Sequence, residues 1–142
     1  AAYPDQSITV AADLAAAVAF ADMEACGTAS SQPVLRGEWL RAGQHVELIG
    51  SYLPSMREAD DVAMKRARIF VDCRETTVDH IGELIDPIAN GSITRADILG
   101  DFYDLHGGKF TRRTGDEITL HKNGGGAHLD LMTSRYILEA LT

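Results

Sequence analysis

Cysteine is scarce in this sequence of 142 residues, and motifs that would build a metal or nucleophilic site are missing. The only two cysteines, Cys26 and Cys73, form no CxxC motif. The five histidines show neither the HExxH spacing nor a cluster with cysteine, so we expect no metal. The lack of a GxSxG elbow argues against an α/β-hydrolase. Two unpaired thiols predict a reducing, cytoplasmic compartment.

Positive charge and long apolar runs are also in short supply. The 13 lysines and arginines stand against 21 acidic residues, which gives a net charge of −8. Phosphate backbones repel such a chain, so we expect no nucleic-acid partner. The longest apolar stretch near the start, Leu14 to Ala21, is too short to cross a bilayer. We therefore expect neither a signal peptide nor a membrane segment.

The sequence does contain an alternation of strand-type and helix-type segments. Short continuous apolar runs such as Ile69-Phe70-Val71 are typical of strands buried on both faces of a parallel sheet. The pattern predicts strands at Ser7–Val10, Met23–Gly27, His45–Ile49, Ala67–Val71 and Glu117–Lys122. It predicts helices at Asp13–Ala21, Glu58–Arg66, Glu75–Leu84, Thr94–Leu105 and Ala127–Leu141. The alternation predicts an α/β fold with a mostly parallel sheet, ending in a strand and a long helix.

The candidate site segments are the strand exits, because ligands of such sheets bind where strands end and loops begin. These exits are Thr28–Ser31, Gly50–Met56, Cys73–Glu75 and Asn123–Gly126. The last joins a strand to a helix through three glycines. Such a turn either lets a polar ligand approach the helix start or only allows close packing, and the local sequence does not decide between the two.

Two polar side chains near these exits, those of Arg57 and His121, each allow a structural and a functional interpretation. For Arg57 we favour a structural ion pair, with Glu58, Asp60 or Asp61 as its partner. His121, next to the glycine turn, is the one histidine worth testing as a proton donor. We favour its alternative, a strand residue that faces solvent or packs on a neighbour.

In combination these segments resemble the C-terminal part of the ornithine cyclodeaminase and mu-crystallin family. The similarity follows the family's order over nearly the whole chain. It begins at Ala21-Asp22 and ends in the glycine turn and Leu129-Asp130-Leu131. The matching stretches between these are Thr28-Ala29-Ser30, Pro33 to Leu40, Gly43 to Val46, Ile49-Gly50-Ser51, Met56-Arg57-Glu58, Val71-Asp72, Gly82-Glu83-Leu84, Gly100-Asp101 and Asp116 to Leu120.

The resemblance implies a partial Rossmann-like three-layer sandwich. Residues 1–110 would form the second half of an NAD(P)-binding domain. Residues 111–142 would form a strand and helix that return toward the substrate and dimerisation domain. The family's glycine-rich fingerprint is not in the sequence, so we expect it upstream of Ala1, with the residues that distinguish NAD from NADP. The full-length parent is expected to be a homodimer.

The resemblance also implies NAD or NADP as cofactor. Thr28 would sit against it, the backbone of residues 47–50 would run beside the nicotinamide ribose, and Asn123 and Gly124 would border nicotinamide and substrate. The cofactor-binding residues would be Thr28, Glu47, Leu48, Ile49, Gly50 and Asn123. The substrate-binding residues would be Tyr52 and Gly124.

Two departures from the family pattern bear on the reaction. Ornithine cyclodeaminases carry an aspartate, the acid/base, at the position of Tyr52, and a lysine at that of Met56. The differences favour relatives that reduce cyclic imines, such as pyrroline-2-carboxylate, or that oxidise small amino acids. We therefore expect part of an NAD(P)-dependent oxidoreductase with no catalytic residue yet assigned. The alternatives are a non-catalytic protein that binds NAD(P) and a small ligand, and an inactive truncated product.

Overall fold

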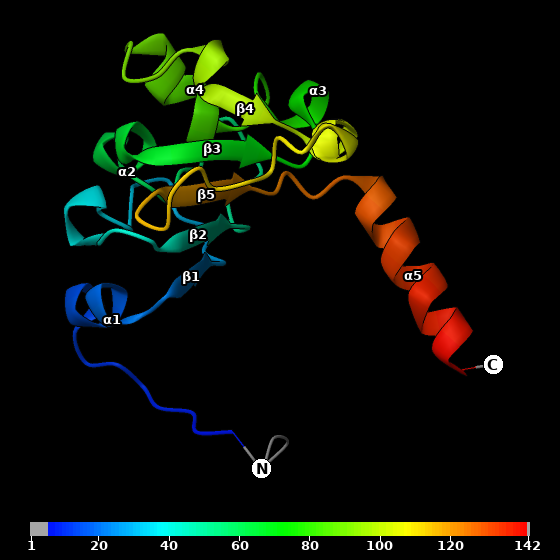
Figure 1. Cartoon of the computed structure of the whole chain (residues 1–142), viewed down its shortest axis with the longest axis horizontal. Coiled ribbons are helices and arrows are strands. Elements are labelled where there is room, and N and C mark those ends of the chain that lie inside the picture. The colour runs from blue at the N-terminus through cyan, green and yellow to red at the C-terminus, as the bar shows by residue number, and fades with distance from the viewer. Residues whose placement is uncertain (1–5, 142) are drawn as a thin grey trace.

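A five-stranded parallel sheet organises the computed structural model, which describes residues 6–141 (Figure 1). Every neighbouring pair of strands is parallel, which confirms the predicted α/β fold. The order across the sheet is β1-β2-β5-β3-β4, so the last strand of the chain lies in the middle. The strands are β1 (Met23–Cys26), β2 (His45–Leu48), β3 (Ala67–Val71), β4 (Ile98–Gly100) and β5 (Ile118–Lys122).

The helices are short, apart from the last one. Asp13 caps the first helix by accepting the backbone N–H groups of Ala15 and Ala16. Among residues 6–141, every helix is too short or too polar to cross a bilayer. The α-helices are α1 (Leu14–Phe20), α2 (Asp61–Arg66), α3 (Arg74–Thr77), α4 (Gly82–Ala89) and α5 (Ala127–Leu141). The 3-10 helices are η1 (Gly37–Trp39), η2 (Arg95–Asp97) and η3 (Phe102–Gly107).

The core lies between one face of the sheet and the helices α1, α2 and α4. Side chains alternate between the two faces along a strand, so Val46 and Leu48 in β2 share a face with Leu120 in β5. All three are fully buried and belong to one cluster with Met64 of α2 and Leu84 of α4. The residues between them, which include Glu47, point to the opposite face.

That opposite face is covered in part by η3 and the segment that follows it. The ring centroids of Phe70, in β3, and Phe110 lie 4.7 Å apart, and Phe102 of η3 packs 6.3 Å from Phe110. A hollow of about 460 Å³ remains there, lined by these aromatic rings and by polar strand residues such as Glu47 and His121. The second face of the sheet is therefore more polar than the first.

Three predicted elements differ in the structure. Ser7–Val10 forms no strand. The helix predicted at Thr94–Leu105 is wrong: the segment holds η2, the edge strand β4 and η3. Asp97 accepts the backbone N–H and hydroxyl of Thr94, which closes a tight turn before β4. The helix predicted at Glu75–Leu84 is divided into α3 and α4, which are separated by residues 78–81.

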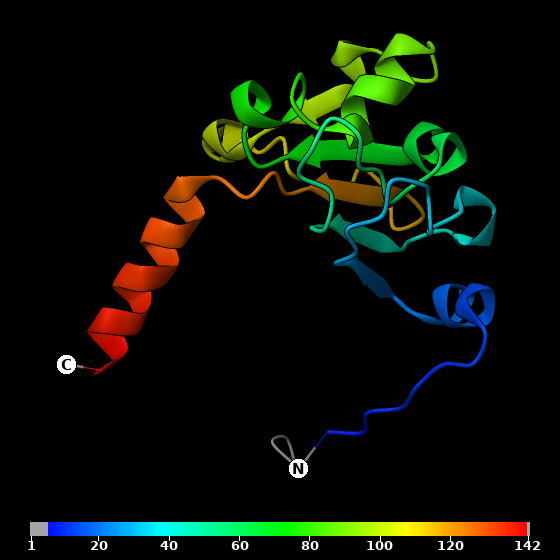
Figure 2. The ribbon, with the colours of Figure 1, turned by 180° about the vertical axis from the view of Figure 1, so that it is seen from behind.

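The last helix, α5, leaves the carboxyl end of β5 and extends away from the sheet (Figures 1 and 2). None of its described residues is buried, and its exposed apolar side chains include Leu131, Tyr136 and Leu138. The preceding strand, β5, pairs with β2 on one side and β3 on the other. The division of the chain at residue 110 stays a prediction.

Candidate functional site at the strand exits

The exits of β1, β2 and β5 lie side by side at the carboxyl edge of the sheet. The backbone N–H of Ile49 donates to the carbonyl of Cys26 at 2.8 Å, which joins the ends of β1 and β2. The backbone N–H of Asn123 donates to the carbonyl of Leu48 at 3.0 Å, which joins the ends of β2 and β5. The segments that begin at Thr28, Ile49 and Asn123 therefore form one continuous edge.

A single buried carboxylate fastens the first two exits together. Oε1 of Glu58 accepts the backbone N–H of Thr28 at 2.6 Å and its hydroxyl at 2.9 Å. Oε2 accepts the backbone N–H of Gly50 at 2.7 Å and that of Ser51 at 3.2 Å. Glu58 is fully buried, and hydrogen bonds to a carboxylate are stronger than those between neutral groups. The two turns are thus held in a fixed relation.

The close approach of these turns explains why residue 50 is glycine. A Cβ atom there would lie 2.0 Å from the carbonyl oxygen of Thr28 and 2.4 Å from Oε1 of Glu58. The first of these contacts is with backbone, which cannot rotate away. Only a residue without a side chain lets the ends of β1 and β2 meet in this way.

Behind this edge lie a second buried acid and a buried lysine. Oε2 of Glu83 accepts the hydroxyl of Ser51 at 2.8 Å and the backbone N–H of Glu58 at 2.7 Å. Burial raises the pKa of Glu83 above its ordinary value. The ammonium group of Lys122 donates to the carbonyls of Leu48 at 3.1 Å and Ser51 at 2.6 Å. Burial lowers the pKa of Lys122, although the nearby Glu83 carboxylate opposes that change.

The β5 exit is held by a third buried acid, Asp72, at the end of β3. Its Oδ2 accepts the backbone N–H of Gly124 at 2.9 Å, and its Oδ1 accepts the hydroxyl of Thr77 at 2.7 Å. A Cβ at Gly124 would lie 2.7 Å from Oγ1 of Thr77. Oδ1 of Asn123 accepts the backbone N–H of Gly125 at 2.8 Å, which shapes the start of the glycine turn.

The remaining predicted site residues differ in what they can offer a ligand. Ile49 is 50% exposed and Tyr52 is 59% exposed, so both side chains are accessible from solvent near the edge. The side chain of Leu48 is buried in the core. The side chain of Glu47 lies on the opposite face, where His121 Nδ1 is 2.8 Å from Glu47 Oε1. Leu48 and Glu47 can therefore meet a ligand at this edge only through their backbone.

His121 and Arg57 have the structural environments that we favoured from the sequence. His121 pairs with Glu47 and stacks on Phe102, with ring centroids 5.5 Å apart, so it is a strand residue packed on its neighbours. Arg57 forms an ion pair with Asp61 and donates from Nε to the carbonyl of Ala59 at 2.9 Å.

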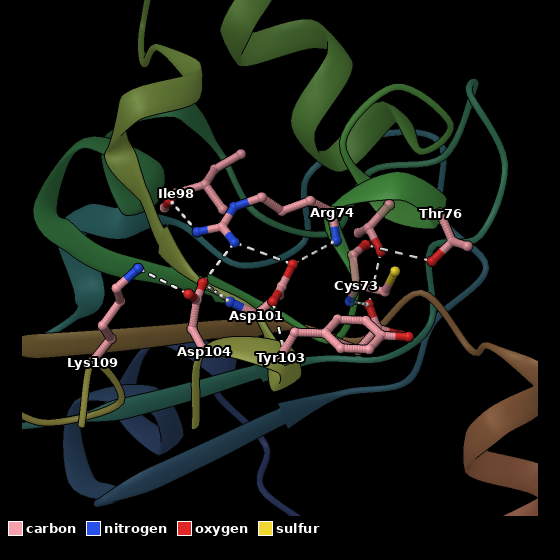
Figure 3. Close-up of polar contacts among 10 residues, drawn as sticks. Cys73, Arg74, Thr76, Ile98, Asp101, Tyr103, Asp104 and Lys109 are labelled. Atoms are coloured by element: carbon pink, nitrogen blue, oxygen red, sulfur yellow. Dashed lines mark hydrogen bonds and ion pairs between the residues drawn. The ribbon is translucent and has the colours of Figure 1, made fainter. Parts of the chain in front are cut away.

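A second polar cluster joins α3, which follows β3, to η3, which follows β4 (Figure 3). Nη1 of Arg74 is 2.7 Å from Oδ2 of Asp104 and 3.1 Å from Oδ2 of Asp101, and Lys109 donates to Oδ1 of Asp104 at 2.8 Å. Hydrogen bonds from Lys109 and Arg74 hold the pKa of Asp104 below its ordinary value. Since its charges are paired, this cluster fastens η3 to the sheet.

Within residues 6–141, no group of three or more His, Cys, Asp or Glu side chains is arranged to hold a metal ion.

The buried residues Glu58, Asp72, Glu83 and Lys122 were not assigned to the site from the sequence. One signal for Lys122 was available. In the alternating pattern of β5 it shares a face with Ile118 and Leu120, which are both apolar. The acids gave no comparable local signal. The strand exits that they hold lie far from them in the chain: Asp72 is 52 residues from Gly124, and Glu58 is 30 residues from Thr28.

An apolar groove of about 450 Å³ lies between α1 and β1. Thr28 is among the residues that line it, so the groove adjoins the site. Among residues 6–141, β1 pairs only with β2, so this edge of the sheet is unpaired.

Comparison with known proteins identifies the family of this chain. The model of the ornithine cyclodeaminase/mu-crystallin family matches residues 1–142. A Delta(1)-pyrroline-2-carboxylate reductase of Paracoccus denitrificans is 52% identical over 138 residues, which are 96% of this chain and 44% of that protein. The chain thus spans less than half the length of this relative.

Two solved structures extend the likeness to the fold. The Thermococcus litoralis Delta(1)-pyrroline-2-carboxylate reductase, in complex with NADH and L-proline, matches with a TM-score of 0.81 and 28% identity, over 86% of this chain and 38% of that one. The iminosuccinate reductase of Paracoccus denitrificans, in complex with NAD+, matches with a TM-score of 0.77 and 28% identity, over 89% and 39% of the two chains.

Proposed function

This chain belongs to the ornithine cyclodeaminase/mu-crystallin family, and from that premise we propose that it forms the nicotinamide-binding wall of an NAD(P)-dependent reductase. The proposed substrate is a small cyclic imine or amino acid. The whole enzyme's activity is part of the proposal, because the chain spans 44% of the reductase that it matches at 52% identity.

One observation carries the proposal: three adjacent strand exits are fastened into one edge by buried acids. Glu58 holds Thr28 and Gly50, and Asp72 holds Gly124. In open parallel sheets, ligands bind outside the carboxyl ends of the strands. A backbone edge that is fixed before a ligand arrives loses little conformational entropy on binding, which favours affinity.

The residues at this edge fit a nicotinamide nucleotide. The hydroxyl hydrogen of Thr28 is donated to Glu58, so its oxygen lone pairs stay available to accept from a ribose hydroxyl. The half-exposed Ile49 offers an apolar surface for a ring. A Cβ at Gly125 would meet no atom within 4 Å, so the glycine turn leaves open space beside Asn123.

We assign the roles accordingly. Thr28, Asn123 and the backbone of residues 47–50 would bind the cofactor, and Tyr52 and Gly124 would border the substrate. The cofactor supplies hydride chemistry at an imine or amine carbon when bound. The chain's own part is to orient the nicotinamide by the β2 exit and to place the substrate next to the glycine turn.

The cellular setting is also proposed. Cys26 and Cys73 are free thiols, which is compatible with a reducing, cytoplasmic compartment. A homodimer of the whole protein is proposed from the family resemblance.

The test is titration of the protein with NADH and NADPH, comparing wild type with Thr28→Val. The variant keeps the side-chain shape but loses the hydroxyl, so the dissociation constant is expected to rise about tenfold. Thr133→Val, in the exposed helix α5, is the matched control. An unchanged dissociation constant for Thr28→Val would rule out its role.

Turnover is tested separately, by NADH oxidation with a panel of cyclic imines that includes pyrroline-2-carboxylate. Steady-state oxidation supports the reductase. Tight cofactor binding without turnover of any imine or amino acid would instead favour a binding protein.

A further inference from the structure

Lys122 occupies a position at which a strand of this kind normally carries an apolar side chain. It follows Ile118 and Leu120 on the core face of β5, and it is fully buried. Lysine is rarely buried to this extent, because an ammonium group loses its hydration on leaving water. A buried lysine therefore has to be stabilised by specific partners.

The partners of Lys122 are two carbonyls in one turn. Its ammonium group donates to the carbonyl of Leu48, the last residue of β2, and to that of Ser51, three residues later. These carbonyls bracket Ile49 and Gly50. One side chain from β5 thus spans the whole exit turn of the neighbouring strand.

The same turn is held from the other side through its amides. Oε2 of Glu58 accepts the N–H groups of Gly50 and Ser51, and Glu83 accepts the hydroxyl of Ser51. The acids bind the donors of the turn and the lysine binds its acceptors. The turn therefore has partners for both kinds of backbone group, which restricts its position.

The charges of these groups depend on one another. Burial raises the pKa of Glu83, and the nearby Lys122 charge opposes that rise. Burial lowers the pKa of Lys122, and the Glu83 and Glu58 carboxylates oppose that fall. A neutral residue at position 122 would leave both carboxylates without this neighbouring cation. The substitution would therefore also affect the hydrogen bonds by which Glu58 holds Thr28, Gly50 and Ser51.

We propose that Lys122 is a positioning residue that holds the Leu48–Ser51 turn in the shape contacted by the nicotinamide ribose. This inference rests on the function proposed above. Lys122 itself lies behind the turn and would not touch the cofactor. Its effect on binding would pass through the carbonyls of Leu48 and Ser51.

The test compares Lys122→Met and Lys122→Arg with wild type. Methionine keeps an unbranched chain of similar bulk but removes the charge and the N–H donors. Arginine keeps both, although its planar guanidinium cannot reproduce the geometry of an ammonium group. Lys65→Met, at an exposed lysine of α2, controls for the loss of a lysine elsewhere.

Two quantities are measured for each variant. The first is the position of the backbone amide resonances of Gly50 and Ser51 in the ¹⁵N-labelled protein, which reports on the turn without any cofactor. The second is the dissociation constant for NADH. In Lys122→Met we expect both resonances to move and the dissociation constant to rise roughly ten- to a hundredfold. For Lys122→Arg, the resonance shifts and the dissociation constant should lie between those of wild type and Lys122→Met. For Lys65→Met, both quantities should match those of wild type.

The inference is overturned by either of two results. A folded variant that binds NADH weakly while Gly50 and Ser51 keep their wild-type resonances would show that Lys122 acts by another route. Shifted resonances with unchanged NADH affinity would show that the position of the turn does not govern binding. If Lys122→Met does not fold, Lys122→Arg provides the same two measurements. Failure of wild type to bind NADH would instead refute the proposed function, while the resonances would still report whether Lys122 sets the turn.

Discussion

Thr28 and Glu58 lie 30 residues apart in the chain and meet through two hydrogen bonds of 2.6 and 2.9 Å. The same carboxylate also holds Gly50, so one side chain sets the distance between two strand exits. The candidate site is therefore shaped from behind, by buried groups that a ligand would not contact.

Replacing Glu58 with glutamine should destabilise the protein. An amide offers one acceptor oxygen in place of two, and its NH₂ group would face backbone N–H groups that now donate to Glu58. We expect Glu58→Gln to lower the free energy of unfolding by about 3 kcal/mol in urea denaturation. Glu75→Gln, at an exposed position of α3, should stay within about 0.5 kcal/mol of wild type. Equal stabilities of the two variants would contradict the claim that Glu58 holds the exits of β1 and β2 together.

Gly50→Ala should separate the ends of β1 and β2. The added methyl group would overlap the Thr28 backbone, so we expect a loss of about 3 kcal/mol or more in thermal or chemical unfolding. Gly27→Ala, at the neighbouring exit, is the control because its Cβ would meet no atom within 4 Å. A Gly50→Ala protein as stable as Gly27→Ala would mean that the turns are not in contact.

The carboxylate of Glu47 should make stability depend on acid. Burial alone would raise its pKa, but hydrogen bonds from His121 and His45 outweigh it and lower the pKa from 4.5 to about 2. A folded-state pKa below the unfolded one gives stability that is present above about pH 4.5 and is lost as the pH falls toward about 2. Urea midpoints across this range should therefore fall more steeply in wild type than in Glu47→Gln. Parallel curves for the two proteins would show that the histidines do not stabilise the charge.

The thiol of Cys26 should be unreactive near neutral pH. Burial, followed by the charges of Glu58 and Glu83, raises its pKa from 9.0 to about 12. Its thiolate fraction is then about a thousandfold below that of an ordinary cysteine. Alkylation by iodoacetamide, followed by peptide mass spectrometry, should label Cys26 slowly in the folded protein and rapidly in urea. Equal rates in the two conditions would disprove the shift.

Much of the sheet could be predicted because four of its strands are short segments with apolar residues in a row or at alternate positions, bounded by turns. The predicted strand Ala67–Val71 has the bounds of β3. The edge strand β4 was missed because its three residues carry too little pattern and lie between polar residues that also suit a helix. Ser7–Val10 has β-prone residues, but among residues 6–141 it has no pairing strand to fix it.

The site could be predicted only in outline. Parallel strands place their exits at one edge, so the meeting of Thr28, Gly50 and Asn123 follows from the topology. The identity of the groups that hold the exits does not follow from local sequence. Glu58 lies just before a helix, where an acid also suits a solvated surface, and only the folded chain shows it buried.

In the part of the chain that the structure describes, the outer edge of β1 is unpaired, and a strand added there would set the direction in which a ligand would lie. A further parallel strand added there would bring its own carboxyl end beside Thr28 and would extend the row of exits sideways. A long dinucleotide would then run perpendicular to the strands. Its nicotinamide would be near the glycine turn after β5, and its far end would lie beyond β1.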